Sequence, residues 1–288
     1  MDEEFRVHTG TSLNTQAESS PDTMGLMSSN VAVGLCLAVL VSTGAAAAGA
    51  LTVRAALASS ALGTIVFAAG GITWSVPLLT FFVTSSVLSR RTRDASLEPT
   101  ADGTTRRTAR QVVANGSMPG LWAACHFILP GNAWSILFAS ALATAAADTW
   151  ATEVGRHSSH SPRDALTGRR VPAGTSGGIT VPGLAASVGG ATAVTVACLI
   201  TGVIGPSQAA AIALAGSLGG LVDSLLGSSL QERRWCSTCG EETEDAIHPR
   251  CSSSTSYLYG FPGFDNDWVN LSAGAAGSFI GLALTYLL

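Results

Sequence analysis

Long runs of uncharged, mostly apolar residues constrain this chain more than any other feature of its sequence. Of the 288 residues, 47% are hydrophobic and only 12% are charged, against roughly 25% charged in ordinary soluble domains. The alternative is a soluble protein with a large helical core, but the number of long apolar runs argues against it. A membrane-crossing helix needs about 20 such residues, and eight runs approach or reach that length. The predicted spans are Val31–Leu51, Ala55–Ala69, Ile72–Leu88, Gln111–Leu129, Ala133–Trp150, Gly178–Ile200, Gln208–Leu226 and Val269–Leu288.

These runs predict an all-α, polytopic membrane helix bundle of about eight transmembrane helices. The second and third runs are short and meet at Gly70-Gly71, so a re-entrant hairpin is the alternative for this pair. Residues 1–29 are polar, acidic and rich in Ser and Thr, and we expect a disordered tail there. Residues 30–288 then form the transmembrane domain, which includes a loop at 228–268.

The arginines predict the topology. All 15 basic residues are Arg, and with eight spans 14 of them fall in the loops on one side of the membrane. Because basic residues favour the cytoplasmic side, we expect a multi-pass protein whose functional site lies on its cytosolic face.

Four aspartates lie near the predicted cytosolic ends of three helices. They are Asp148, Asp223, Asp265 and Asp267. Oxygen ligands of this kind suit Mg²⁺, which usually bridges to phosphate. The alternative for each is a solvated charge at a helix end, or an N-cap for Asp265. Glu153 follows Asp148 by five residues, so the two carboxylates share one ion only if the helix loosens near Gly155.

A glycine-rich segment, "RRVPAGTSGGIT", leads into the sixth predicted span on the same side. Its candidate phosphate-binding residues are Gly174, Thr175, Ser176, Gly177 and Gly178. Such a turn can direct backbone N–H groups toward an anion, and the following helix adds the positive end of its dipole. A flexible glycine turn is the alternative.

The fourth span opens with polar residues. Gln111 and Asn115 share one face of this helix, and Arg110 lies at its start, within reach of a phosphate. Ordinary anchoring of the helix by positive charge is the alternative for the arginine. The third span ends in "TSSVLSRR", whose hydroxyls either coordinate a ligand or, as we favour, bond back to their own helix.

Three cysteines and a histidine in the last loop predict a metal site. Cys236 and Cys239 form CxxC, and His248 and Cys251 form HxxC. This spacing suits structural, tetrahedral Zn²⁺, with free thiols or a redox pair as the alternatives. A bound metal would pin the long loop that leads into "DNDWVN".

Six motifs in order resemble the integral membrane family that includes the plant phytyl-phosphate kinase of the vitamin E pathway. They are "TSSVLSR", "RQVVANGSMP", "ADTWATEVG", "PAGTSGGITVPG", "GSLGGLVDSLLGSSLQ" and "DNDWVNL". The resemblance implies phosphoryl transfer from a nucleotide, CTP, to an isoprenoid monophosphate. The functional residues that it implies are Asn115, Asp148, Glu153, Gly174, Thr175, Gly177, Gly178, Asp223, Asp265, Asn266 and Asn270.

We therefore expect a membrane-embedded kinase that acts on a phytyl or prenyl monophosphate with Mg²⁺ as cofactor. Its partners are then a nucleotide, an isoprenoid lipid phosphate and membrane lipid, and not nucleic acid. A cytidylyltransferase or an isoprenoid-alcohol kinase would use the same parts. A membrane transporter is the alternative of another class, but it would place its charged residues near the bilayer midplane.

Overall fold

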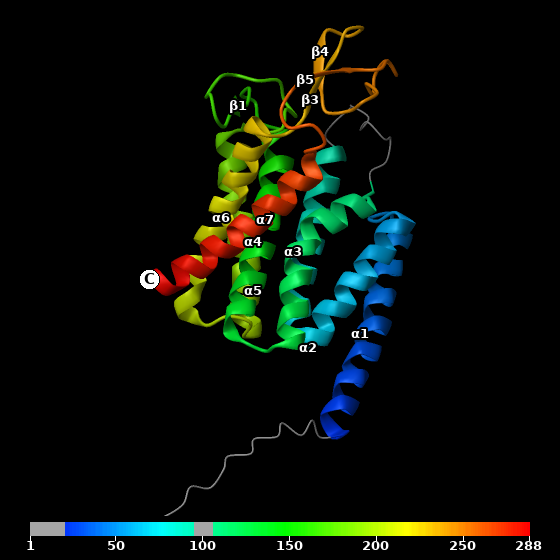
Figure 1. Cartoon of the computed structure of the whole chain (residues 1–288), viewed down its shortest axis with the longest axis vertical. Coiled ribbons are helices and arrows are strands. Elements are labelled where there is room, and N and C mark those ends of the chain that lie inside the picture. The colour runs from blue at the N-terminus through cyan, green and yellow to red at the C-terminus, as the bar shows by residue number, and fades with distance from the viewer. Residues whose placement is uncertain (1–20, 95–105) are drawn as a thin grey trace, which may run out of the picture.

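The computed structural model describes residues 21–94 and 106–288, with side chains from residue 29 to 91 and from 106 onward. Most of the predicted tail 1–29 therefore lies outside the described residues, although a helix already begins at Pro21. The described helices are α1 (Pro21–Ala47), α2 (Val53–Asp94), α3 (Ala109–Ile128), α4 (Asn132–Gly155), α5 (Val181–Thr201), α6 (Pro206–Ser229) and α7 (Asn266–Leu287). They form one bundle, with every described strand at the same end (Figure 1).

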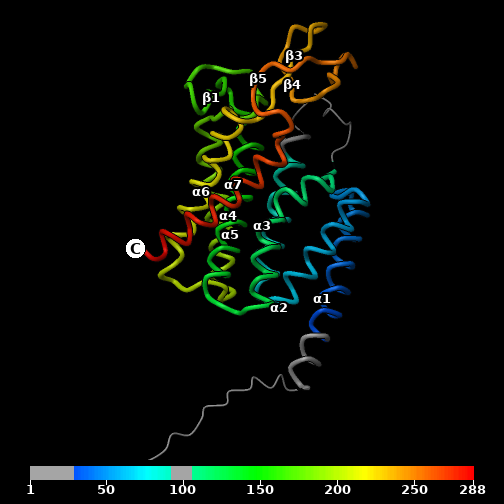
Figure 2. Tube along the Cα trace, in the orientation of Figure 1, coloured from blue at the N-terminus to red at the C-terminus, as the bar shows by residue number. Residues whose placement is uncertain are grey.

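Helix α2 contains both short apolar runs. Its backbone leaves the helical region at Gly70 and Gly71, where Gly71 has a φ of 57°. Its two ends lie close together: Arg90 donates to the carbonyl oxygen of Ala48 at 2.6 Å, just before the helix begins. The chain therefore reverses at the glycine pair, and α2 is a hairpin of two helical arms (Figure 2).

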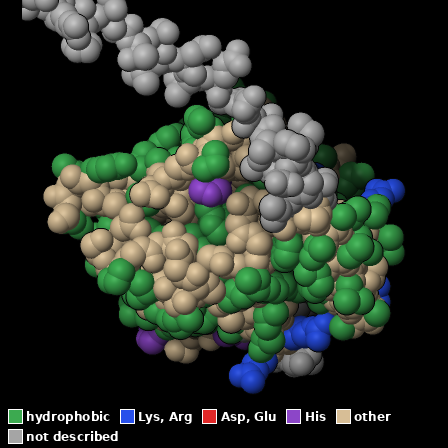
Figure 3. Space-filling model, turned by 90° about the horizontal axis from the view of Figure 1, so that it is seen from below, with side chains coloured by type: hydrophobic (Ala, Val, Ile, Leu, Met, Phe, Trp, Pro, Cys, Tyr) green, Lys and Arg blue, Asp and Glu red, His purple; other side chains and the backbone are tan. Residues whose placement is uncertain are grey.

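The prediction of a polytopic helix bundle is confirmed, since five helices of the described chain are long and apolar enough to cross a membrane. They are α1, α2, α5, α6 and α7. Helices α3 and α4 are not among these five candidate spans. Seen from the end opposite the strands, hydrophobic side chains are spread over the described surface among backbone and uncharged groups, and no carboxylate is visible (Figure 3).

Helix α4 is the centre of the bundle and contacts α2, α3, α5, α6 and α7. All of its residues from Ile136 to Ala147 are buried, so it needs few lipid-facing side chains. Its neighbours approach closely through glycine, as small residues allow between membrane helices. A Cβ at Gly216 of α6 would lie 2.6 Å from the Cβ of Ala143, and one at Gly190 of α5 would lie 2.6 Å from the carbonyl oxygen of Ala146.

The strands add small sheets to a fold that was predicted as all-α. Strands β1 (Arg163–Asp164) and β2 (Gly178–Ile179) form an antiparallel pair. The predicted loop 228–268 contains a second antiparallel sheet in the order β4-β3-β5. Its strands are β3 (Arg233–Cys236), β4 (Glu241–Thr243) and β5 (Ser256–Tyr259). We call this three-stranded segment the metal-ligand lobe, and the end of the bundle that bears both sheets the loop end.

Candidate functional site

A polar cavity of about 390 Å³ opens at the loop end of the bundle. It collects side chains from α2, α3, α4, α6 and α7, together with the glycine-rich turn. Of the residues predicted for the site, it is lined by Asn115, Asp148, Glu153, Gly174, Thr175, Ser176, Gly177, Gly178, Asp223, Asn266, Asp267 and Asn270. The structure thus brings together residues that are up to 155 positions apart in the sequence.

Asp148 of α4 and Asp223 of α6 face each other in this cavity, within hydrogen-bonding reach. Gly220 lies one helical turn before Asp223, and a Cβ there would meet the backbone nitrogen of Asp148 at 3.4 Å, so the glycine lets α6 approach α4 at this level. Asp223 is only 8% exposed, and its Oδ2 is buried with no hydrogen-bond partner. Two facing carboxylates need a shared proton or a cation between them.

Glu153 lies one turn beyond Asp148 and also lines the cavity. Helix α4 does not loosen between the two carboxylates, because it continues to Gly155. Glu153 is buried and accepts a hydrogen bond of 2.5 Å from the hydroxyl of Ser89 on α2. This bond ties α2 to α4 at the rim of the cavity.

The hydroxyls at the end of α2 behave in three ways. Thr84 bonds back to the carbonyl oxygen of Thr80 at 2.7 Å, as predicted for this group. Ser89 donates a hydrogen bond to Glu153 on α4. Ser86 lines the cavity with a buried hydroxyl oxygen that has no partner. A buried polar atom of this kind marks a place where a ligand or water belongs.

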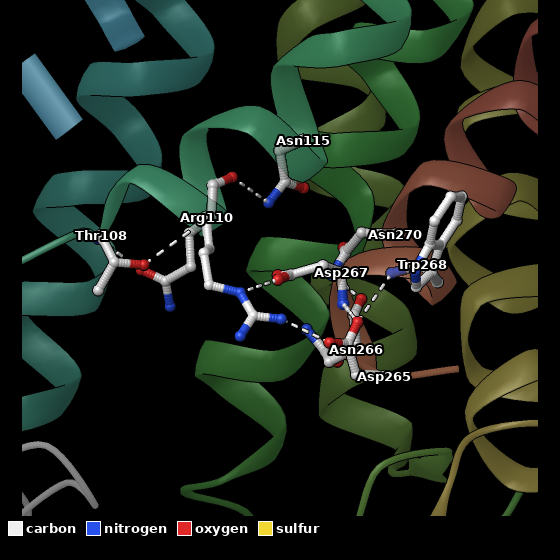
Figure 4. Close-up of polar contacts among 9 residues, drawn as sticks. Thr108, Arg110, Asn115, Asp265, Asn266, Asp267, Trp268 and Asn270 are labelled. Carbon is white, nitrogen blue, oxygen red and sulfur yellow. Dashed lines mark hydrogen bonds and ion pairs between the residues drawn. The ribbon is translucent and has the colours of Figure 1, made fainter. Parts of the chain in front are cut away.

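Two side-chain amides, one on α3 and one on α7, line the cavity and bond to their own helices. Asn115 of α3 donates its Nδ2 to the carbonyl oxygen of Gln111 at 3.1 Å. Asn270 of α7 donates its Nδ2 to the carbonyl oxygen of Asn266 at 2.9 Å. Each bond fixes the amide on its own helix while the side chain lines the cavity (Figure 4).

The glycine-rich turn is held against the cavity by its own backbone and by α6. The nitrogen of Gly178 donates to the carbonyl oxygen of Thr175 at 3.0 Å, and the hydroxyl of Ser228 on α6 donates to the carbonyl oxygen of Gly177 at 3.1 Å. Gly177 has a φ of 75°, and a Cβ there would clash with Ser228. Thr180 then caps α5 by accepting from the nitrogen of Gly183. The turn is therefore a fixed element.

Two residues that the sequence did not single out clamp this turn to the metal-ligand lobe. Arg233 is buried and donates through Nη2 to the carbonyl oxygen of Ser176 at 2.6 Å and to that of Gly227 at 3.5 Å. It also pairs with Glu244 at 3.1 Å. Gln231 accepts the hydroxyl of Ser176 at 2.5 Å. No sequence pattern distinguishes these two side chains from other polar residues of a loop.

Arg110, Asp265 and Asp267 meet beside the cavity (Figure 4). The Arg110 guanidinium bridges Asp265 and Asp267, with both contacts at 2.5 Å, and its side chain is 71% exposed. Asp265 also caps α7 by accepting from the nitrogens of Asp267 and Trp268. Arg110 and Asp265 are not among the residues that line the cavity, whereas Asp267 is.

Three other arginines line the cavity instead. They are Arg90, Arg107 and Arg156, from the end of α2, the start of α3 and the end of α4. Arg156 lies beyond the end of the helix that carries Asp148, and both side chains line the cavity. From the sequence, these arginines are expected only to anchor the helix ends on one side of the membrane. Their convergence depends on the reversal of α2, which brings Arg90 beside the start of α3.

The four predicted zinc ligands converge in the metal-ligand lobe. The ligand atoms of Cys236, Cys239, His248 and Cys251 all lie within 4.8 Å of one another. Nδ1 of His248 is 3.3 Å from Sγ of both Cys239 and Cys251. Zinc–sulfur bonds of about 2.3 Å in a tetrahedron place two sulfurs roughly 3.8 Å apart, so the cluster fits this ion.

The surroundings of the cluster suit a cation as well. Hydrogen bonds from Ser253 lower the pKa of the Cys251 thiol to about 6, which favours the thiolate form that binds a metal. Nε2 of His248 is 3.9 Å from Oε2 of Glu241. A carboxylate beside the second ring nitrogen commonly orients a metal-bound histidine.

Comparison with known proteins places the same region in one family. The model of the family "Integral membrane protein DUF92" matches residues 36–278. "Protein PGR" of Arabidopsis thaliana is 31% identical over 152 residues, which cover 49% of this chain and 51% of the plant protein. The chain thus spans about half the length of that relative. An uncharacterized membrane protein of Methanocaldococcus jannaschii is 32% identical over 183 residues, or 62% of this chain and 73% of that protein. No solved structure matches.

Proposed function

The chain belongs to the DUF92 family of integral membrane proteins, and we propose that it is a multi-pass membrane enzyme that transfers a phosphoryl group from CTP to an isoprenoid monophosphate. The observation that carries this proposal is the pairing of Asp148 and Asp223 in a cavity that three arginines also line. Carboxylates suit a divalent cation, and arginines suit phosphate oxygens. A site that holds both suits a metal-bound nucleotide beside a second phosphate.

The cation of this proposal is Mg²⁺. Asp148 and Asp223 would hold it, with Asn115 and Asn270 as further oxygen donors and Asp267 nearby. The unpartnered Oδ2 of Asp223 supports this assignment, because it is a buried carboxylate oxygen of a residue that lines the cavity. When bound, the cation supplies charge neutralisation for the phosphates.

The glycine-rich turn and the arginines would hold the phosphates. The turn lies at the start of α5, where a helix dipole favours an anion, and Ser228 and Arg233 fix its backbone. A phosphate held there would share the cavity with Arg90 and Arg107. Positioning of this kind supplies most of the catalysis in phosphoryl transfer.

The reaction needs little acid–base chemistry from the protein. An oxygen of the lipid monophosphate would bond to the γ-phosphorus of CTP as the bond from that phosphorus to the bridging oxygen of the β-phosphate breaks. The products are CDP and a lipid diphosphate. The attacking oxygen is already ionised near neutral pH, so no side chain has to remove a proton. Glu153, held by Ser89, would position α2 and α4 around the reacting groups.

The position of the cavity also bears on the rival functions. It lies at the loop end, among arginine-bearing segments that we propose face the cytosol. A transporter would place its site nearer the bilayer midplane. A cytidylyltransferase would join CMP to the lipid phosphate and release pyrophosphate, and an isoprenoid-alcohol kinase would act on the free alcohol.

The decisive experiment incubates purified protein in detergent with Mg²⁺, CTP labelled in its γ-phosphate, and phytyl or geranylgeranyl monophosphate. Label in a lipid diphosphate together with free CDP supports the proposal. Label in pyrophosphate identifies a cytidylyltransferase. In a parallel incubation with the free alcohol in place of its phosphate, label in the lipid monophosphate identifies an alcohol kinase. Absence of every labelled product with an otherwise folded protein contradicts the proposal.

A further inference from the structure

A second cavity adjoins the polar one and has the opposite character. It has a volume of about 230 Å³ and lies between α1, the two arms of α2 and the start of α3. Its walls are mainly Leu, Val, Phe, Ala and Gly side chains, and we call it the apolar groove. Three residues, Arg107, Gln111 and Asn115, line both cavities. The groove therefore continues the polar cavity, with a charged and amide-bearing boundary between them.

We propose that the apolar groove binds the hydrocarbon tail of the phosphate-bearing substrate and that its depth limits the chain length accepted. This inference rests on the proposed function, because the polar cavity is taken to hold the phosphate. An amphiphile with an anionic head and an apolar tail satisfies both cavities at once. Its head would lie with the arginines and its tail along α1 and α2.

The boundary residues support an occupant of this kind. The guanidinium carbon of Arg107 lies 5.4 Å from the centroid of the Phe81 ring, and both residues line the groove. Arg107 would therefore meet phosphate oxygens on one side, and it meets an aromatic wall on the other. Gln111 and Asn115 lie one turn apart on the same face of α3. The step from polar to apolar lining is thus sharp, as the junction of a lipid head and tail requires.

The hairpin of α2 sets the depth of the apolar groove. On the second arm the groove runs from Phe82 near the boundary to Ile72 beside the reversal at Gly70–Gly71. Ten residues of helix span roughly 15 Å. The tail would therefore lie along the second arm and approach the far end of the groove at Phe67 and Ser75, which also line it.

Glycines on α1 and α2 set the width of the apolar groove. A Cβ at Gly63 would meet the Cβ of Ala38 on α1 at 3.0 Å, and one at Gly34 would meet Phe67 at 3.0 Å. These contacts draw α1 onto the first arm of α2 without large side chains between them. A bulky residue in the groove would therefore fill space that a tail needs.

Two matched substitutions test the inference. Ser75→Phe fills the far end of the groove, and Ser59→Phe fills the end near the boundary. We expect Ser75→Phe to lower kcat/KM at least about tenfold for a geranylgeranyl phosphate, since even one lost methylene contact is worth about that much. It should leave geranyl phosphate, which is half as long, nearly unchanged. Ser59→Phe should lower kcat/KM for both substrates. Val83→Phe is the control, because Val83 lies on the same arm, is 52% exposed and does not line the groove.

A binding measurement keeps the inference separate from the reaction. A prenyl monophosphate with a photoreactive group on its last isoprene unit, used without nucleotide, should label the segment from Phe67 to Ser75. Excess unlabelled prenyl monophosphate should suppress the labelling. If the neutral alcohol suppressed it equally well, the groove would be a site for membrane lipid, and the inference would be overturned. Labelling elsewhere, or an unchanged chain-length profile in Ser75→Phe, would overturn it too. Correct labelling without phosphoryl transfer to any lipid phosphate would leave the tail site standing and refute the proposed reaction.

Discussion

Arg233 donates a hydrogen bond of 2.6 Å to the backbone carbonyl oxygen of Ser176, and this bond joins the strand that carries Cys236 to the glycine-rich turn. The metal-ligand lobe and the polar cavity are therefore mechanically connected. The link runs through a buried guanidinium that also pairs with Glu244. Burial raises the pKa of Glu244, and Arg233 acts against that rise.

Replacing Arg233 by Met should free the glycine-rich turn. The substitution leaves the carbonyl oxygens of Ser176 and Gly227 without their donor and Glu244 without its partner, and losing one member of a buried pair costs about 3–5 kcal/mol. Glu244 is partly exposed, which places the expected loss at the low end. Limited trypsin digestion should cut faster after Arg169 and Arg170, which are exposed just before the turn. Arg54→Met, at an exposed position on α2, is the control. An unchanged cleavage rate in the Arg233 variant would show that the turn is held without it.

The lobe should contain zinc. Elemental analysis of the purified protein is expected to give about one zinc per chain, because four ligand atoms converge as a tetrahedral site requires. Cys236→Ser should lose the ion and loosen the same trypsin site, since Arg233 begins the strand that ends at Cys236. Cys125→Ser, outside the cluster, should keep the ion. Zinc-free protein with full activity and an unchanged trypsin site would contradict this prediction.

Acid should weaken the lobe through Glu232. A hydrogen bond of 2.6 Å from the nitrogen of Gly263, followed by the contact with Arg234, lowers the pKa of this carboxyl. A carboxyl with a lowered folded pKa stabilises the native state above its unfolded pKa, near 4.5, and loses that contribution as the pH falls through the folded value. Trp235 fluorescence during urea unfolding should show this loss in the parent protein. The Glu232→Gln variant should have a lower free energy of unfolding at pH 7, and this free energy should fall less as the pH is lowered. An identical acid dependence of the free energy of unfolding in both proteins would rule out this role.

The sequence allowed the bundle and most of the cavity to be predicted for a physical reason. Charges are costly next to hydrocarbon, so Asp148 and Asp223 stand out at the ends of apolar runs, and helix ends on one side of a membrane lie at one depth. The contacts between individual side chains could not be predicted in this way. The bridge from Arg110 to the start of α7, and the clamp by Arg233, depend on how two distant segments pack. The strands of the metal-ligand lobe have only three or four residues, too few for an alternating pattern to show.

Asp148 and Asp223 provide the most direct test of the site. If both hold one Mg²⁺, Asp148→Asn and Asp223→Asn should each lower the rate of phosphoryl transfer by about 10²-fold or more, a loss typical of removing one key electrostatic contact. Asn keeps the size and one oxygen but removes the charge that balances the cation. Folding should suffer little, because each substitution also relieves the repulsion between two facing carboxylates.

The double variant separates a shared role from two independent ones. Residues that act as one unit are not additive, so the pair should lose scarcely more activity than either single variant. Raising the Mg²⁺ concentration, or substituting Mn²⁺, should restore part of the rate in the single variants because their defect is weaker metal binding. Ser217→Ala on α6, whose hydroxyl only bonds back to Ala213, is the control for a mild change in the same helix. The measurement is initial rate against metal concentration for the parent protein and all four variants. A folded double variant that still converts prenyl phosphate at nearly the parent rate would show that the catalytic metal site lies elsewhere.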